Sequence, residues 1–204
     1  MGRGRSGLGA NNAQASQQTS AQASTQGNAQ KVASTLLSVE NRIADDKVES
    51  AIAVDESGNI LFDTSDGAAS QVSFGPKEQR MAYGKILTHN HPKGYYLSVE
   101  DVSTAVTLNL RQVRATTPDG RTFVLERKSD SAQGAALQKA YYTELHATAS
   151  QATAQGVANA PMSALGNMQK LNHYVALEHT KIINKWLADN APKYGYEFRE
   201  ETRK

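Results

Sequence analysis

Two histidines one residue apart, followed by a turn and then a serine and an aspartate, are the residues whose types and spacing could bind a metal. They lie in KILTHNHPKGYYLSVEDVSTA, residues 85–105. In a β-strand, residues i and i+2 face the same way, so His89 and His91 can direct both imidazoles at one point. A proline and a glycine then bend the chain, and Asp101 can close over that point. Two imidazoles, one carboxylate and an open fourth position form the ligand set of a catalytic zinc site.

The chain contains no cysteine, which excludes disulfides, thiolate metal sites and cysteine catalysis. Zinc lowers the pKa of a bound water toward ~7, and a hydrolytic site then needs a carboxylate near that water as general base. Glu49 is the expected base, because it begins a β-rich run that we expect beside the histidine strand. Glu40, in an expected helix, and Glu56, in an expected turn, are the alternatives.

The same residues also suit the start of a helix that binds no metal. SVED, residues 98–101, resembles a capping box in which Ser98 accepts a hydrogen bond from the backbone of Asp101. Acidic residues in a first helical turn are also favoured by the helix dipole. The spacing alone therefore leaves both interpretations open.

The pattern around this segment predicts an α+β domain over residues 32–130, with a mixed or mostly antiparallel sheet and a central capped helix. An amphipathic helical segment leads into it. The expected order is then a hairpin, a loop, a strand, a helix and a second hairpin. Their expected ranges are 48–64 for the first hairpin, 85–91 for the strand, 99–111 for the helix and 113–127 for the second hairpin.

Residues 131–204 are expected to form a C-terminal helical extension. Residues 132–160 are rich in Ala and Gln and predict a long helix of modest burial. After Pro161, a better amphipathic pattern predicts a second helix that Pro192 ends. The final YGYEFRE is typical of a strand that pairs with a sheet edge.

The first part of the chain, residues 1–31, is expected to be a disordered low-complexity tail. AQASQQTSAQASTQGNAQ contains no large apolar side chain, so ordering it would cost backbone entropy without hydrophobic gain.

Charge and hydropathy limit the partners and the compartment. Lys and Arg number 22 against 20 Asp and Glu, and this net charge of +2 argues against a nucleic-acid partner. MGRGRSG precedes no apolar run, so it predicts no secretory signal, and no stretch approaches the ~18 apolar residues of a membrane span. We expect a cytoplasmic protein without a membrane partner, in a bacterial or phage-infected cell.

The string H-x-H-P-x-G followed by S-x-x-D resembles the signature of the JAMM (JAB/MPN) metallopeptidases, and HNHPKG is especially similar to the RadC-like variant. The resemblance implies zinc ligands His89, His91 and Asp101, with Ser98 as a donor to the oxyanion. It also implies that Glu49 is the general base. The implied function is zinc-dependent hydrolysis of a peptide or isopeptide bond in a protein or peptide substrate.

This resemblance covers roughly residues 46–127 and departs from the family in one spacing. The family usually has seven residues between the second histidine and the serine, whereas PKGYYL provides six. The shorter loop decides whether Asp101 reaches the histidines. Glu49 also lacks the sequence pattern that surrounds the base in eukaryotic isopeptidases, so its assignment depends on chain order and strand pairing.

A second similarity is to modules of phage and prophage proteins, often attached to head morphogenesis proteins. AVDESGNILF, LTHNHPKG, LRQVRATTPDGRTFVL and KYGYEF carry it. It implies a phage or host protein partner and the alternative function: a non-catalytic assembly or partner-binding module that keeps a JAB-like fold.

The other histidines, on the expected C-terminal helices, are interpreted as surface or packing residues. His173 and His179 are six residues apart and do not share a helical face, and His146 is treated in the same way. Tyr95 and Tyr96 lie in the loop between the expected ligands and could line a substrate cleft or cover the core.

Overall fold

The computed structural model describes residues 10–65 and 73–203, with residues 10–24 and residue 65 described by their backbone alone. Six strands form one mixed sheet in the order β2-β1-β3-β4-β5-β6. The pair β3 and β4 is parallel, and the other neighbours are antiparallel. The strands are β1 (Ser50–Val54), β2 (Ile60–Ser65), β3 (Ile86–Asn90), β4 (Gln112–Thr116), β5 (Arg121–Arg127) and β6 (Tyr196–Thr202). The predicted α+β class, both hairpins and the C-terminal edge strand are confirmed.

The parallel pair of strands requires a crossover, and α3 (Val99–Thr107) supplies it. The chain leaves the carboxyl end of β3, follows the loop from His91 to Ser98, and enters α3 before returning as β4. The expected helix over residues 99–111 ends earlier, at Thr107, where Leu108 is the C-cap and Asn109 has φ 47°. The short helix α2 (Pro76–Ala82) precedes β3.

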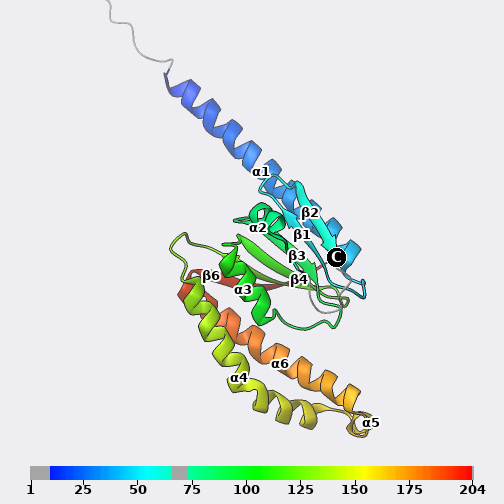
Figure 1. The fold of residues 1–204 in the computed structure, drawn as a ribbon. Coiled ribbons are helices and arrows are strands. Elements are labelled where there is room, and N and C mark those ends of the chain that lie inside the picture. Colours follow the sequence, from blue (N-terminus) through cyan, green and yellow to red (C-terminus); the bar gives the residue numbers. More distant parts are fainter. Residues whose placement is uncertain (1–9, 66–72, 204) are drawn as a thin grey trace, which may run out of the picture.

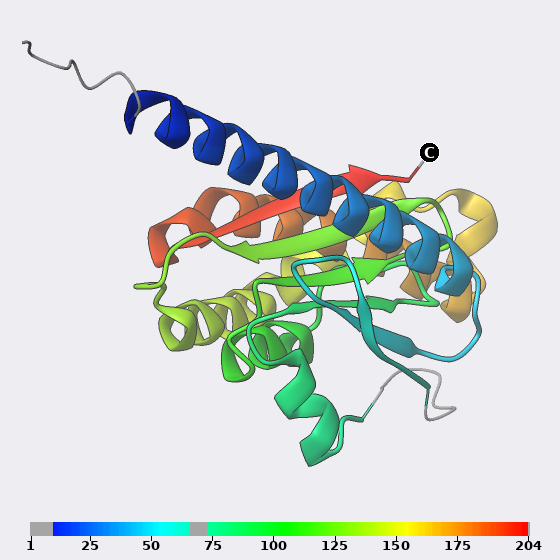
Figure 2. The same cartoon turned by 90° about the horizontal axis from the view of Figure 1, so that it is seen from above.

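Each face of the sheet buries its own hydrophobic cluster, because neighbouring residues of a strand point to opposite faces. On one face, Ile52 and Ile86 pack with Leu36, Val39 and Ile43 of α1 (Ala10–Ile43). On the other face, Ala51, Leu87 and Val113 join a larger cluster that includes side chains of α3 and of the C-terminal helices. Figure 2 shows α1 across one side of the sheet and these helices on the other side.

Residues 1–31 were expected to be a disordered tail, whereas α1 begins at Ala10 in the structure; residues 1–9 lie outside the described residues. The second half of α1 is held against the sheet by its apolar residues. The helix is therefore already nucleated, and Ala and Gln, which favour helix, extend it toward the N-terminus. Residues 25–31 are exposed, and Figure 1 shows this half of α1 reaching beyond the sheet.

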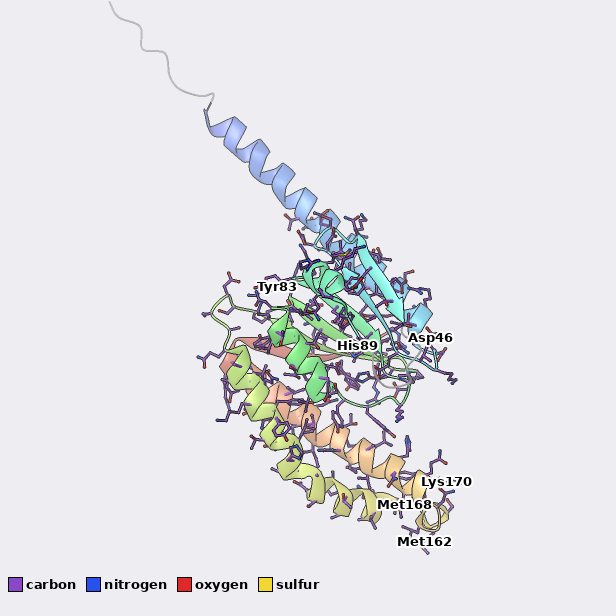
Figure 3. The ribbon with its side chains drawn as sticks, in the orientation of Figure 1. Asp46, Tyr83, His89, Met162, Met168 and Lys170 are labelled. Carbon is purple, nitrogen blue, oxygen red and sulfur yellow. The ribbon has the colours of Figure 1, made fainter. Side chains whose placement is uncertain are left out.

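The C-terminal segment shares the core of the sheet domain, so residue 130 is not a boundary in the packing. It forms α4 (Gly134–Asn159), α5 (Met162–Leu165), α6 (Met168–Asn190) and a short 3-10 helix (Ala191–Tyr194) before β6. Leu137 and Tyr141 of α4 and Ile183 and Leu187 of α6 belong to the larger cluster. Figure 3 shows His89 in the sheet and Met162, Met168 and Lys170 at the far tip of the α4–α6 hairpin.

No helix in the described part of the chain has both the length and the apolar character that crossing a membrane requires.

Candidate metal centre

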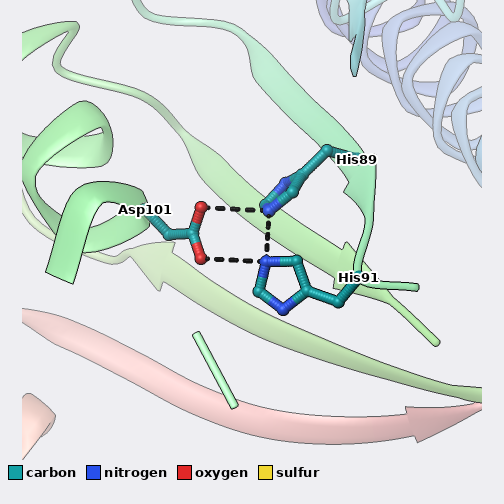
Figure 4. Close-up of side chains that lie close together, drawn as sticks. All are labelled: His89, His91 and Asp101. Atoms are coloured by element: carbon teal, nitrogen blue, oxygen red, sulfur yellow. Dashed lines mark hydrogen bonds and ion pairs between the residues drawn. The ribbon is translucent and has the colours of Figure 1, made fainter. Parts of the chain in front are cut away.

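Three side chains converge at the carboxyl end of β3. The Nε2 atom of His89 lies 3.0 Å from Oδ1 of Asp101, and the Nε2 atom of His91 lies 3.2 Å from Oδ2 of the same carboxylate. The two Nε2 atoms are 2.9 Å apart (Figure 4). Within the described residues, this is the group of His, Asp and Glu side chains that could hold a metal ion.

The elements on either side of the loop set this geometry. His89 and His91 lie on one side of the β3 chain, as strand alternation predicts. Asp101 lies in the first turn of α3, and its Oδ2 accepts a 2.6 Å hydrogen bond from the backbone N–H of Ser98. The Oγ of Ser98 in turn accepts from the N–H of Asp101, so the capping box is present. The six-residue loop is therefore long enough, and one carboxylate both caps α3 and meets the histidines.

A backbone carbonyl fixes the ring of His91. Its Nδ1 lies 3.1 Å from the carbonyl oxygen of Tyr95, and that atom can only accept, so Nδ1 carries the proton and donates. In a neutral imidazole of this tautomer, Nε2 has a lone pair, and here it faces the carboxylate. His91 is also held by its own N–H, which donates to the carbonyl of Thr116 at 2.7 Å. The ring is thus oriented as a metal ligand requires.

The electrostatics of the group favour a positive charge at its centre. Burial lowers the pKa of His91, but the charge and hydrogen bond of Asp101, the Tyr95 carbonyl and the charge of Glu49 together raise it from 6.5 to about 9. Burial raises the pKa of Asp101, but the charges of His89 and His91 hold it well below its ordinary value of 3.8. A proton on His91 therefore balances the Asp101 carboxylate at neutral pH when no metal is bound.

The donor set and its spacing fit zinc. Ligand bonds of ~2.0–2.1 Å at tetrahedral angles put ligand atoms roughly 3.3 Å apart. The three distances here are 2.9, 3.0 and 3.2 Å, so outward shifts of a few tenths of an ångström would admit the ion. Three protein ligands leave the fourth position for water or substrate, as in catalytic zinc sites.

The three candidate ligands line a pocket of about 780 Å³ that Glu49 and Ser98 also line. Ala51 of β1 pairs with His89, and continuing this register brings Glu49 opposite His91. The influence of Glu49 on the pKa of His91 agrees with that position. The structure therefore brings all five residues of the expected site to one place.

Both alternatives for the base lie elsewhere. Glu40 is buried on the α1 side of the sheet, where it pairs with Arg114 at 2.6 Å and accepts from the hydroxyl of Thr88 at 3.0 Å. Glu56 lies in the β1–β2 turn and pairs with Lys85 at 2.6 Å. Neither lines the pocket of the metal ligands.

The two loop tyrosines lie beside the candidate ligands. Both Tyr95 and Tyr96 line the pocket. The Tyr96 hydroxyl also lies 3.4 Å from Nδ1 of His179 in α6, whose Nε2 lies 3.2 Å from the Thr148 hydroxyl. His179 is thus a packing residue with polar partners, as expected.

Sequence reasoning missed two groups that support the site. The Tyr95 carbonyl orients His91, but a backbone atom leaves no mark in a residue pattern. The second group is Asn90, which lies between the two histidines in the sequence. Its side chain is fully buried and hydrogen-bonds to the chain beside Glu49. An amide at the carboxyl end of the expected strand was the available signal, because an amide that becomes buried there needs partners.

No protein-family model matches the chain, and no curated protein or solved structure matches it either. Fold and site together define an α+β protein whose sheet and crossover helix bring two histidines and an aspartate into one pocket.

Proposed function

We propose that this protein is a zinc-dependent hydrolase of the JAMM type, with a JAB-like fold, that cleaves a peptide or isopeptide bond in a protein substrate. The observation that carries the proposal is the convergence of His89, His91 and Asp101 on one point, with Glu49 across the strand pair. When bound, zinc supplies Lewis acidity and a water of lowered pKa.

The chain's own residues have separate tasks in this reaction. Glu49 lines the same pocket as the ligands, and its carboxylate takes the proton of the attacking water and passes it to the leaving amine. The Ser98 hydroxyl accepts from the Asp101 backbone through its oxygen, which leaves its proton to donate to the developing oxyanion. The Asp101 carboxylate is held in place by the Ser98 N–H, so the ligand set is preorganised.

Metal analysis tests the proposal directly. The protein, stripped with a chelator and reloaded, should contain one zinc per chain, and His89→Ala or Asp101→Ala should remove it. Glu49→Gln should keep the zinc and abolish turnover, because an amide cannot accept the proton. A folded wild-type protein that takes up no zinc would refute the proposal. Turnover by Glu49→Gln would mean that another residue is the general base.

The non-catalytic module expected from the phage similarity makes the opposite prediction. Partner binding and stability would then be nearly unchanged in His89→Ala, and zinc would have no effect on either. The orientation of His91 by the Tyr95 carbonyl favours the metal site, because a residue needed only for packing does not require a defined tautomer.

A further inference from the structure

Asn90 lies between the two histidines in sequence but does not join them in the pocket. Its side chain is fully buried, with 0% exposure. The Oδ1 atom accepts a 2.7 Å hydrogen bond from the N–H of Ser50. The Nδ2 group donates to the carbonyl of Val48 at 3.0 Å and to the carbonyl of Asp46 at 3.3 Å. Two of these bonds go to the segment that leads into β1, and the third goes to Ser50, the first residue of β1.

These bonds enclose Glu49, since one partner directly precedes it and another directly follows it. Strand β1 begins only at Ser50, so Glu49 lies just before the regular ladder of the sheet. The segment from Ala44 to Glu49 contains turns and bends with no helix or strand. The hydrogen bonds of the Asn90 side chain thus fix the backbone beside Glu49, where the regular ladder of the sheet has not yet begun.

We propose that Asn90 is the positioning residue of Glu49: it fixes the backbone on both sides so that the carboxylate faces the metal ligands. The inference rests on the proposed function and assigns to Asn90 the placement of its general base. Because the same residue separates the two histidines, one strand end holds both imidazoles and the base in register.

An amide is the side chain that this position requires. Its oxygen meets a backbone N–H and its nitrogen meets two carbonyls, so both an acceptor and a donor are needed. Aspartate would keep the acceptor and turn its second oxygen toward the two carbonyls. Alanine would leave the Ser50 N–H and the two carbonyls without this partner.

A spin label tests the placement without any activity assay. The chain contains no cysteine, so Glu49→Cys gives a single attachment site for a nitroxide, and Glu56→Cys in the β1–β2 turn gives a matched control. We expect Asn90→Ala to increase the mobility of the label at position 49 and to leave the label at position 56 unchanged. Asn90→Asp, which keeps the acceptor but loses the donor, is a second variant. It should also increase the mobility of the label at position 49. Unchanged mobility at position 49 in a folded variant overturns the proposal.

A cobalt spectrum, recorded without labels, links this placement to the metal centre. With Co²⁺ as the probe, Glu49→Gln should change the visible absorption, because the carboxylate borders the ligands. Asn90→Ala should reproduce that change while binding one Co²⁺ per chain, and the double variant should show no further change. If the Co²⁺ spectrum of Asn90→Ala is the same as that of the wild type, the proposal is overturned, even where the label at position 49 becomes more mobile.

The two proposals fail separately. A wild-type protein that binds no metal refutes the proposed hydrolase, and the label at position 49 then still decides whether Asn90 places Glu49. A wild-type protein that binds metal, with Asn90→Ala unchanged in both readouts, leaves the hydrolase in place and refutes the role of Asn90.

Discussion

At the scale of single residues, Asp101 shows why a capping pattern and a metal pattern cannot be separated by sequence. Its Oδ2 accepts from the Ser98 N–H and lies 3.2 Å from His91, while Oδ1 lies 3.0 Å from His89. A carboxylate has two oxygens with several lone pairs, so one side chain can cap a helix and bind a cation together. The capping interpretation of SVED is confirmed, and the same carboxylate can also serve the proposed metal site.

Zinc affinity should rise with pH, because the proton on His91 competes with the metal. The pKa of His91 is raised to about 9 in the metal-free protein, whereas ligation needs its neutral form. The apparent affinity should increase up to about tenfold per pH unit from about pH 6 to 8.5 and level off above about 9. Chelator competition at several pH values measures this dependence, and calorimetry in buffers of different ionisation enthalpy counts the proton released. An affinity that does not change with pH would contradict a protonated His91.

The free energy of unfolding of the metal-free protein should show the opposite pH dependence: it should fall as the pH rises. Because folding raises the pKa of His91 from 6.5 to about 9, its stabilisation is fully present below pH 6.5 and is lost as the pH rises through about 9. Urea unfolding of chelator-treated protein across this range measures the loss. His91→Gln should remove most of the slope, and a wild-type free energy of unfolding that stays level would argue against the ion pair.

At the scale of elements, the crossover from β3 to α3 makes the site, and the C-terminal helices hold that crossover. The Tyr141 hydroxyl of α4 donates to the carbonyl of Leu97, next to Ser98, and α3 and α4 pack against each other. At the preceding position of the loop, Tyr96 contacts His179 of α6. The helical hairpin therefore supports the loop that joins the two parts of the ligand set.

Tyr141→Phe should destabilise the protein, and Tyr142→Phe should not. Tyr141 is 0% exposed, so removing its hydroxyl leaves the Leu97 carbonyl without this donor at a cost of ~1–3 kcal/mol. Tyr142 is 53% exposed and serves as the matched control on the same helix. Urea unfolding of both variants measures the difference, and zinc competition should show weaker binding for Tyr141→Phe alone. Equal stability of the two variants would mean that the Leu97 contact contributes little.

Ser98→Ala should separate the cap from the ligand set. The hydroxyl that caps α3 is lost, at a cost of about 1 kcal/mol, but the backbone N–H that holds Asp101 remains. We expect the variant to keep one zinc per chain with a lower free energy of unfolding, and to lose turnover because the oxyanion donor is absent. Metal analysis, urea unfolding and an activity assay check the three parts, and full turnover would exclude the donor role.

The sequence predicted the elements better than their assembly, for reasons visible in particular residues. Local periodicity and turn residues are sufficient to define the hairpins, α3 and β6. The helix from Ala10 depends on nucleation by residues 32–43 packed on the sheet, which composition does not contain. The assignment of Glu49 as the base depends on an assumed strand pairing, and the proposed role of Asn90 depends on bonds to residues forty or more positions earlier.

At the scale of the whole molecule, a buried ion pair ties α1 to the face of the sheet opposite the candidate metal centre. Glu40 is 2% exposed and accepts from Arg114, which is 5% exposed and also pairs with Glu201 of β6 at 2.6 Å. Three separate elements, α1, β4 and β6, meet in this network. The first helix and the last strand are thereby joined through the centre of the sheet.

Glu40→Ala should destabilise the fold strongly without emptying the metal centre. Removing one partner leaves Arg114 buried with less compensation, and breaking a buried pair typically costs about 3–5 kcal/mol. Glu56→Ala, which removes an exposed pair with Lys85, should change stability little and is the control. Urea unfolding gives the two costs, and zinc analysis should find one ion per folded chain in both variants, because the ligands lie on the other face. Loss of zinc from folded Glu40→Ala would show instead that the two faces of the sheet are coupled through β3, where Thr88 contacts Glu40 and His89 follows it in the chain.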